Sequence, residues 1–233
     1  MKVYGIVKDN KHSFNDFGLW IVDKQINPPS KKRITASIPY MNGVYDFSGL
    51  YGETTYEERS LKYVFEIVED TKEMLNIKKI EAINWLIPGE KFYLYDDAFP
   101  GFKFYAECID SSFSEEGIKG KLTATFTAYP FKISTLQDGH DIWDEFNFNL
   151  DVIQETKFEI ENIKKIQLYN SSSIGINPII ICSSNMEIVK GNTTYKFNAG
   201  ESKSWSFKLN KGLNDLIIKG TGTIEFKWYK EVL

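Results

Sequence analysis

Apolar and polar residues alternate with a period of two along several segments of the chain, and this alternation limits the possible folds more than any other feature. In residues 59–69, Leu61, Tyr63 and Phe65 fall on one face, with lysine, glutamate and valine on the other. Residues 118–131 repeat the pattern, with threonines on the second face. Successive side chains of a β-strand point to opposite sides, so both segments are predicted to be strands. An aromatic share of 15% also favours a sheet-rich fold.

Residues from about 71 to 86 form the one segment with a helical pattern. Asp70 and Glu73 have the spacing of a capping box, which places Asp70 at the N-cap. Pro88 and Gly89 end the segment. Apolar residues recur at intervals of three, and others widen them into a face that is predicted to cover the core. The first set is Met74, Ile77, Ile80 and Ile83, and the second is Leu75, Ala82 and Leu86.

A change in composition divides the chain into two predicted domains. Further strands are expected at residues 2–7, from about residue 19, and at residues 91–95 and 102–110. The composition changes after Tyr129 and Pro130, and turn-like residues follow at 134–139. We therefore predict an N-terminal domain of residues 1–135, which contains the helix, and a C-terminal domain of residues 136–233.

The C-terminal domain shows strand signals and no helix signal. Turn residues rich in Gly, Asn and Ser separate short apolar segments at intervals of roughly 8–12 residues, which is typical of a β-sandwich. The expected strands are residues 143–151, 157–169, 178–182, 186–189, 193–197, 203–209, 213–219 and 222–229. The fold class is therefore predicted to be mainly β.

Residues 34–61 fit neither pattern. The segment is rich in Tyr, Phe and Met and has no helical period, and turn residues such as Asn42 and Gly43 interrupt it every few positions. It is too apolar for a solvated loop. Either its own domain covers it, or another copy of the chain does.

Charge and targeting signals exclude several classes of protein. The net charge is −4, so the chain has no basic surface for the phosphates of nucleic acid. No apolar run approaches the roughly 20 residues of a membrane span, and the first residues lack the apolar core of a secretion signal. Cys108 and Cys182 lie in strand-like segments. Two buried free thiols are favoured over a disulfide, which fits synthesis in a reducing cytoplasm.

Few residues offer catalytic or metal-binding chemistry. His12 lies in a polar turn, and His140 lies between Asp138 and Asp144 in a segment that is read as a solvated linker rather than a metal site. No nucleotide-binding or hydrolase motif is present. Acidic pairs such as Glu57-Glu58 could in principle serve glycoside hydrolysis, but such pairs in turns are usually solvated. We therefore predict no catalytic residue, no metal and no cofactor.

Four aromatic residues of the C-terminal domain could stack on a saccharide: Trp143, Trp205, Trp228 and Tyr229. The other interpretation is that they fill the core or an interface. Trp205 and Trp228 are embedded in strand alternation, which favours the core.

Several motifs in sequence order resemble the distal tail proteins (Dit) of siphophages and related prophages. The resemblance covers most of the chain. Its most specific part is IPYMNGVYDFS at Ile38 to Ser48, followed by Tyr56-x-x-Arg59. It also includes FNDFGL from Phe14, Gly52-Glu53, the helix end Trp85-Leu86, YLYD from Tyr93, LTATFTAYP from Leu122 and KGLN from Lys211. One departure is Tyr40, because the family often has Gly after Ile-Pro.

The resemblance implies a β-barrel-like N-terminal domain with one helix and a long hairpin extension, and a galectin-like C-terminal β-sandwich. It implies a non-enzymatic structural protein of the virion tail tip, made in the cytoplasm of the bacterial host. Its partners would be other copies in a hexameric ring, single or in two stacked rings, the tail tube protein and a tail-tip protein. DNA would pass through the ring without specific binding, and no membrane is involved. The chain has no room for an inserted carbohydrate-binding module.

The irregular segment is then expected to cover a neighbouring subunit. The expected interface residues are Tyr40, Met41, Tyr45, Phe47, Leu50, Tyr51, Tyr56 and Arg59. Large obligate interfaces are rich in aromatic residues, and a closed ring uses head-to-tail contacts. Two alternatives to a ring subunit are a stand-alone carbohydrate-binding β-sandwich that acts in adhesion and, with less support, a hydrolase.

Overall fold

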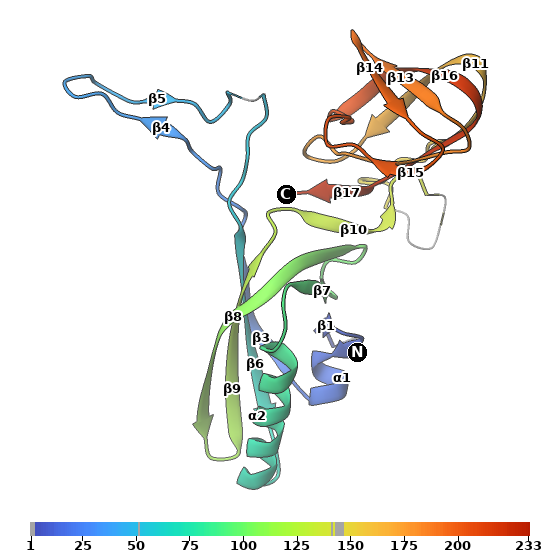
Figure 1. Cartoon of the computed structure of the whole chain (residues 1–233). Coiled ribbons are helices and arrows are strands. Elements are labelled where there is room, and N and C mark those ends of the chain that lie inside the picture. The colour runs from blue at the N-terminus through green and yellow to red at the C-terminus, as the bar shows by residue number, and fades with distance from the viewer. Residues whose placement is uncertain (1–2, 51, 141, 143–146) are drawn as a thin grey trace. The chain divides into compact units, whose positions relative to one another are not determined.

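The computed structural model describes residues 3–50, 52–140, 142 and 147–233, and it contains two compact units (Figure 1). The first unit comprises residues 1–132 with Leu233, and the second comprises residues 133–232. The first unit carries both helices and the second consists of strands and turns. Each unit has a hydrophobic core of its own.

The first unit is built on an antiparallel sheet with the strand order β2-β1-β7-β8-β9-β6-β3. Strand β9 pairs with β6 over ten residue pairs, from Arg59 opposite Ala128 to Val68 opposite Lys119, and with β8 over ten more. The strands are β1 (Ile6–Lys8), β2 (Lys11–His12), β3 (Trp20–Ile26), β6 (Arg59–Val68), β7 (Phe92–Asp96), β8 (Phe102–Glu116) and β9 (Lys119–Ala128). The two segments with the clearest alternation are thus confirmed as neighbouring strands.

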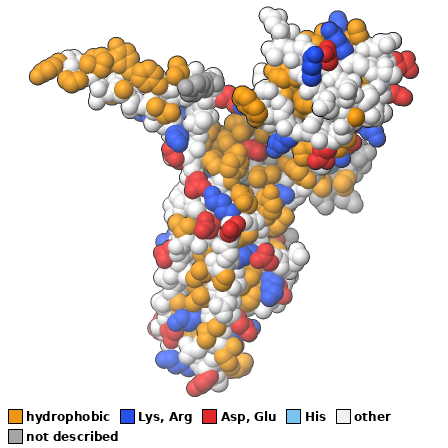
Figure 2. Space-filling model, viewed as in Figure 1, with side chains coloured by type: hydrophobic (Ala, Val, Ile, Leu, Met, Phe, Trp, Pro, Cys, Tyr) orange, Lys and Arg blue, Asp and Glu red, His pale blue; other side chains and the backbone are white. Residues whose placement is uncertain are grey.

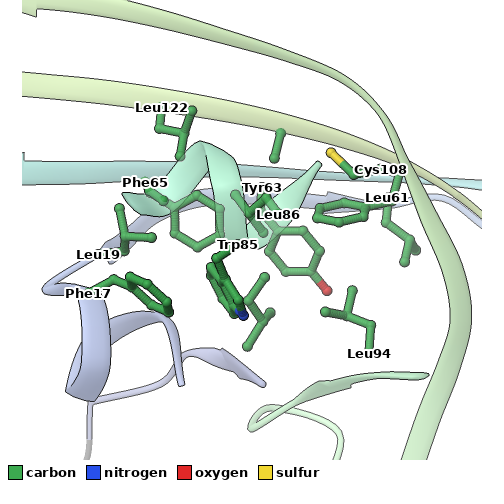
Figure 3. Packing of buried hydrophobic residues seen from close by; sticks show 14 of the residues in the cluster. Phe17, Leu19, Leu61, Tyr63, Phe65, Trp85, Leu86, Leu94, Cys108 and Leu122 are labelled. Carbon is green, nitrogen blue, oxygen red and sulfur yellow. The ribbon is translucent and has the colours of Figure 1, made fainter. Parts of the chain in front are cut away.

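The alternating residues of β6 and β9 form the centre of the first core. Leu61, Tyr63 and Phe65 are buried on one face of β6, as are Leu122 and Phe126 of β9. Figure 3 shows how Trp85 and Leu86 of the long helix pack among the β6 side chains, with Phe17 and Leu19 nearby. The Phe17 and Trp85 rings are stacked at 4.6 Å between centroids.

Helix α2 (Lys72–Leu86) follows β6, and two details of the sequence prediction need correction. Its N-cap is Thr71 rather than Asp70, and the Thr71 side chain accepts a hydrogen bond from the Met74 amide at 3.2 Å. The buried face of the helix is also different. Leu75, Ala82, Trp85 and Leu86 are buried, whereas Met74, Ile77 and Ile80 are exposed. The interval-of-three series therefore does not mark the core face.

A second, short helix was missed by the sequence analysis. Helix α1 (Ser13–Phe17) occupies residues that the sequence suggested as the approach to a strand. The His12 ring caps it, because Nδ1 accepts from the amides of Phe14 and Asn15, both at 3.1 Å. Gly18 ends the helix in the left-handed conformation at φ 68°, which a glycine adopts without steric cost. The prediction of a single helix is therefore wrong.

The second unit contains a sheet with the order β14-β13-β16-β12-β15, and β11 pairs with β16. Strands β10 and β17 pair with each other. The strands are β10 (Lys132–Gln137), β11 (Lys157–Asn170), β12 (Ile179–Cys182), β13 (Met186–Lys190), β14 (Thr193–Phe197), β15 (Gly200–Lys203), β16 (Gly212–Lys227) and β17 (Tyr229–Val232).

Strand β16 organises this unit, and it is one strand where the sequence suggested two. Its first half pairs with β13 and its second half with β12, while β11 pairs with 14 of its 16 residues, from Gly212 to Glu225. Gly220 and Gly222, expected as a turn, lie inside the strand at φ 139° and 127°. A Cβ at Gly222 would lie 2.3 Å from the Ser183 hydroxyl oxygen, so only glycine fits this close approach.

Two other strand predictions in this unit are wrong. Residues 203–209 contribute only the end of β15 and an isolated bridge at Leu209. Of the expected strand 143–151, residues 143–146 lie outside the described residues, and residues 147–151 are turn and irregular structure.

The fold class predicted from the sequence is confirmed apart from the extra helix. The fold is mainly β, with a barrel-like first unit that carries a long hairpin extension and a galectin-like β-sandwich in the second unit. Cys108 and Cys182 are buried free thiols, as expected. No helix among the described residues is long and apolar enough to span a membrane.

Candidate assembly surface

The irregular segment forms a long two-stranded extension of the first unit, which we call the arm (residues 31–56, of which residue 51 is not described). Strands β4 (Thr35–Ala36) and β5 (Tyr45–Asp46) pair antiparallel in the arm. At its base, Lys31 forms a bridge with Tyr56. Figure 1 shows the arm leaving the first unit between the end of β3 and the start of β6.

Local polar contacts hold the two sides of the arm together. The Phe47 amide donates to the Ile34 carbonyl at 2.8 Å, and the Ile34 amide donates to the Ser48 hydroxyl at 2.9 Å. The Arg33 guanidinium lies 3.4 Å from the Asp46 carboxylate. Hydrogen bonds from the Ser48 side chain and backbone are the main cause of a lowered Asp46 pKa. An isolated two-stranded hairpin is at best marginally stable in water, so these contacts alone do not explain the arm.

The apolar side chains of the arm have no cover within the described part of the chain. Figure 2 shows hydrophobic side chains along the length of the arm. Among the predicted interface residues, Tyr40 is fully exposed, and Met41, Tyr45, Phe47 and Leu50 are between 36% and 67% exposed. Ile34, Ile38 and Val44 are equally exposed, and the sequence analysis missed them as contacts although they lie in the same apolar segment. A contiguous exposed patch of this kind marks an interaction site.

The remaining predicted interface residues differ from these five. Tyr51 lies outside the described residues. Tyr56 is half-buried, and its ring meets Phe131 edge-on at 5.4 Å between centroids. It therefore anchors the base of the arm within its own subunit.

Arg59 is 2% exposed, so its side chain is not available for a direct contact with another subunit. Its guanidinium lies 5.9 Å from the centroid of the Phe104 ring. The Nε and Nη2 atoms are buried, and no hydrogen-bond partner for them occurs among the described residues. Burial away from water lowers the Arg59 pKa. We therefore correct the sequence prediction and exclude Arg59 from the arm surface.

The tip of the arm contains a strained turn. The Met41 amide donates to the Ile38 carbonyl at 3.1 Å, which closes a turn with Pro39 and Tyr40 at its centre. Tyr40 has φ 66°, in the left-handed region that favours glycine. A side chain in this conformation costs about 1–2 kcal/mol. Tyr40 therefore stands in a backbone conformation that a glycine would adopt more easily.

The residues considered for chemistry have structural roles. The His12 Nε2 lies 3.0 Å from Asp97 Oδ2 while Nδ1 caps α1, so His12 is not in a free polar turn. Asp138 is buried rather than in a solvated linker, and its Oδ2 accepts from Trp228 Nε1 at 2.8 Å. Burial raises the Asp138 pKa. No group of three or more His, Cys, Asp or Glu side chains that could hold a metal occurs among the described residues.

The four candidate saccharide-stacking residues do not form one surface. Trp228 is buried, as expected for the core, and Tyr229 is exposed. Trp205 is 90% exposed, so its predicted place in the core is wrong. The Asn177 amide holds the Trp205 turn by donating to the carbonyls of Ser204, Trp205 and Phe207 at 3.1, 3.0 and 2.7 Å. Trp143 lies outside the described residues.

Comparison with known proteins identifies the family. Residues 13–128 match the family model of the phage tail protein RIFT-related domain. The crystal structure of the Dit protein of phage SPP1, described as a paradigm of the hub adsorption apparatus in phages that infect Gram-positive bacteria, aligns over 100% of both chains. Its TM-score is 0.70 at 14% sequence identity. The chain thus carries a phage tail protein RIFT-related domain, and it has the fold of a siphophage Dit protein.

The family assignment gives the arm its context. The matched family is one of phage tail proteins, and the arm lies within the matched residues 13–128. The similar SPP1 structure supports the same two-part fold. No curated protein matches the sequence significantly. A stand-alone carbohydrate-binding protein is not favoured by these findings.

Proposed function

We propose that this distal tail protein forms a ring, with six copies as the expected number, that joins the tail tube to the proteins of the tail tip. The observation that carries the proposal is the arm, because its apolar side chains have no cover within the described subunit. Burial of apolar area stabilises by about 25 cal/mol per Å². An extension that leaves so much apolar surface in water is therefore expected to bury it in an assembly.

Head-to-tail contacts would give the arm this cover. In a closed ring, a surface of one subunit meets a different surface of the next, so every arm is covered without a free end. A subunit with these properties needs no catalytic site, and we propose a structural role without enzymatic activity. The arm anchors in this proposal are Tyr40, Met41, Tyr45, Phe47 and Leu50.

Replacing arm residues tests the ring. Tyr45, Phe47 and Leu50 are exposed, so their combined replacement by Ser should leave the subunit folded and reduce the mass in light scattering from a multiple of 26.9 kDa to a single copy. The matched control replaces Ile163 and Leu213 of the second unit, which are also exposed, and should keep the wild-type mass. A triple variant with unchanged mass would refute arm-mediated assembly.

The role in joining tube and tip is tested in the phage particle. Phage that encode the triple variant should produce tails without an attached tip structure in negative-stain electron microscopy. Complete tails would show that the arm is not needed at this junction, whatever the mass of the purified protein.

The proposed ring would also form part of the path for DNA. Six copies at −4 each carry a charge of −24, and an acidic lumen would repel DNA and allow passage without binding. Lys31, Lys32 and Arg33 lie at the base of the arm. These three basic side chains would attract DNA if they lined the channel. A ring structure in which these three residues line the channel, with acidic groups outside, would overturn this part of the proposal.

A further inference from the structure

Helix α2 has apolar residues on two faces, and only one of them faces the core. Leu75, Ala82, Trp85 and Leu86 are buried in the first unit. Met74, Ile77 and Ile80 are 46%, 57% and 59% exposed, and we call these three residues the helix stripe. A surface helix normally has a polar outer face, while a helix that is apolar on all sides is normally buried. The helix stripe is therefore an exposed apolar strip that lies between exposed polar side chains such as Glu73, Asn76 and Asn84.

The geometry points to the arm of a second copy as the cover of the helix stripe. This inference rests on the proposed ring and names the surface that receives each arm. Both surfaces are apolar and exposed, and both belong to the first unit. Charge is also compatible. Residues 34–50 contain one charged side chain, Asp46, which pairs with Arg33, and beside the stripe Lys78 pairs with Glu81 at 3.0 Å.

The lengths of the two elements match. At 1.5 Å per residue, the 15 residues of α2 extend over about 22 Å. Each side of the hairpin between residues 34 and 50 has about eight residues, which span roughly 26 Å at 3.3 Å per residue. An arm that lies along α2 can thus contact the whole helix stripe.

The helix stripe limits the area of each contact. At on the order of 100 Å² for each exposed side chain, its three residues supply about 300 Å². An equal area of the arm gives about 600 Å² per contact, about half of the roughly 1,200 Å² of the smaller specific complexes. The backbone and polar side chains of the arm add to this. A ring repeats the contact at every junction, so a modest area per contact is sufficient.

The arm of the same copy is badly placed to cover the stripe. The arm joins β6 at its first residue, Arg59, and α2 begins beyond its last residue, Val68. The ten residues of β6 separate the two points by about 33 Å. The helix stripe lies in the half of α2 nearest to this far end, and Figure 1 shows the arm leaving at the opposite end of the strand. A contact between different copies avoids this separation and is head-to-tail.

One other apolar surface of the first unit competes for the arm. Strand β3 is the edge of the sheet, and Trp20 and Val22 on it are both 49% exposed. They line a pocket with Tyr4, Ile21 and Ala98. At 3.3 Å per residue, the seven residues of β3 extend over about 23 Å, so this surface is about as long as α2. A variant at Val22 separates the two possibilities.

Complementation between two variants tests the inference. The helix variant carries Ile77→Glu and Ile80→Glu, which keep the helix propensity and place charge on the stripe. The arm variant carries Tyr45→Ser and Phe47→Ser. Each should be a monomer alone, because one side of every contact is damaged. An equimolar mixture should give a 1:1 pair of twice 26.9 kDa, formed by the intact arm of one variant and the intact stripe of the other. Circular dichroism and thermal melting establish whether each variant is folded. If the double Glu variant does not fold, the single variant Ile77→Gln takes its place.

The outcomes separate the inference from the proposed function. A helix variant that keeps the wild-type mass overturns the stripe as the receiving surface and leaves the ring intact. Loss of assembly in Val22→Asp but not in the helix variant assigns the arm to the β3 edge and also overturns it. An arm variant that keeps the wild-type mass, or a wild-type chain that stays monomeric at its highest soluble concentration, refutes the proposed arm-mediated ring and the inference with it.

Discussion

Tyr40 is a residue whose side chain makes its own backbone conformation unfavourable. It lies at the tip of the arm with φ 66°, and its ring is fully exposed. A residue that costs conformational energy and gains nothing within its subunit is expected to gain it elsewhere, because strained residues cluster at functional positions. The strain supports a contact of the Tyr40 ring in the proposed assembly.

Replacing Tyr40 by Gly should separate these two effects. We expect Tyr40→Gly to relieve about 1 kcal/mol of strain in the free arm, because glycine adopts positive φ readily. Slower hydrogen exchange of the Met41 amide, which closes the turn, would measure this gain. The same variant should weaken assembly in light scattering. Faster exchange of the Met41 amide would contradict the relief of strain. A ring as stable as that of the wild type would contradict the proposed contact of the Tyr40 ring.

Asp138 is a buried carboxylate that stabilises the fold through its hydrogen bonds rather than through its charge. Trp228 Nε1 and the Ser171 hydroxyl both donate to it, at 2.8 and 3.1 Å. Burial raises its pKa in the folded protein above the ordinary value of 3.8. The folded state therefore binds more protons than the unfolded state above pH 3.8, and the contribution of Asp138 to stability falls as the pH rises through this window.

Two substitutions of Asp138 should therefore differ. Asp138→Asn keeps an acceptor for Trp228 without the buried charge, so its stability relative to wild type should improve as the pH rises from about 3.8. Asp138→Ala should cost about 1–3 kcal/mol at pH 3, because the Trp228 Nε1 loses its partner, and this difference from wild type should decrease as the pH rises. Urea unfolding followed by Trp fluorescence between pH 3 and 7 measures both. Parallel pH profiles for wild type and Asp138→Asn would exclude the assigned pKa shift.

Helix α2 illustrates what alternation and periodicity can establish for an element and what they cannot. Its existence and its end followed from the sequence, since Leu86 is the last helical residue before Pro88. Its buried face did not, because apolar residues occur on both sides and periodicity cannot say which side meets the sheet. The assignment of Asp70 as the cap failed by one residue for a similar reason, since Thr71 is an equally good capping residue.

The capping assignment is open to a direct test. Thr71→Ala should lower the free energy of unfolding by about 1 kcal/mol, because the Met74 amide loses its acceptor. Asp70→Ala is the matched control and should have less effect. Equal losses in chemical denaturation would mean that both residues cap the helix.

Other elements could not be predicted from the sequence, each for a reason specific to its residues. Helix α1 has five residues, too few to show a period, and its cap is a histidine, an uncommon capping residue. Gly220 and Gly222 suggested a turn, but β16 uses them for a close approach to Ser183. In the arm, five exposed apolar residues were identified and Ile34, Ile38 and Val44 were missed. The burial of Arg59 depends on Phe104, which is distant in sequence. Local patterns thus indicated the exposed arm but not its boundary with the core.

For the molecule as a whole, the separate cores suggest two units that unfold separately. Phe65 belongs to the first core and Phe226 to the second, and both are buried. We propose that Phe65→Ala and Phe226→Ala each lower the stability of one unit by about 3–5 kcal/mol. Differential scanning calorimetry should show two transitions, each moved by one substitution. One transition that both substitutions move equally would show that the units unfold together.

The pairing of β11 with β16 also fixes an order of events during synthesis. Lys157 pairs with Glu225 and Asn170 with Gly212, so partners lie 42 to 68 positions apart along the chain. The ribosome must release residues up to 227 before this ladder can close, whereas the strands from β1 to β9 are complete by residue 128. Non-local pairing of this kind is intrinsically slow. The first unit, with its exposed arm, can therefore fold during synthesis before the β11–β16 ladder of the second unit has formed.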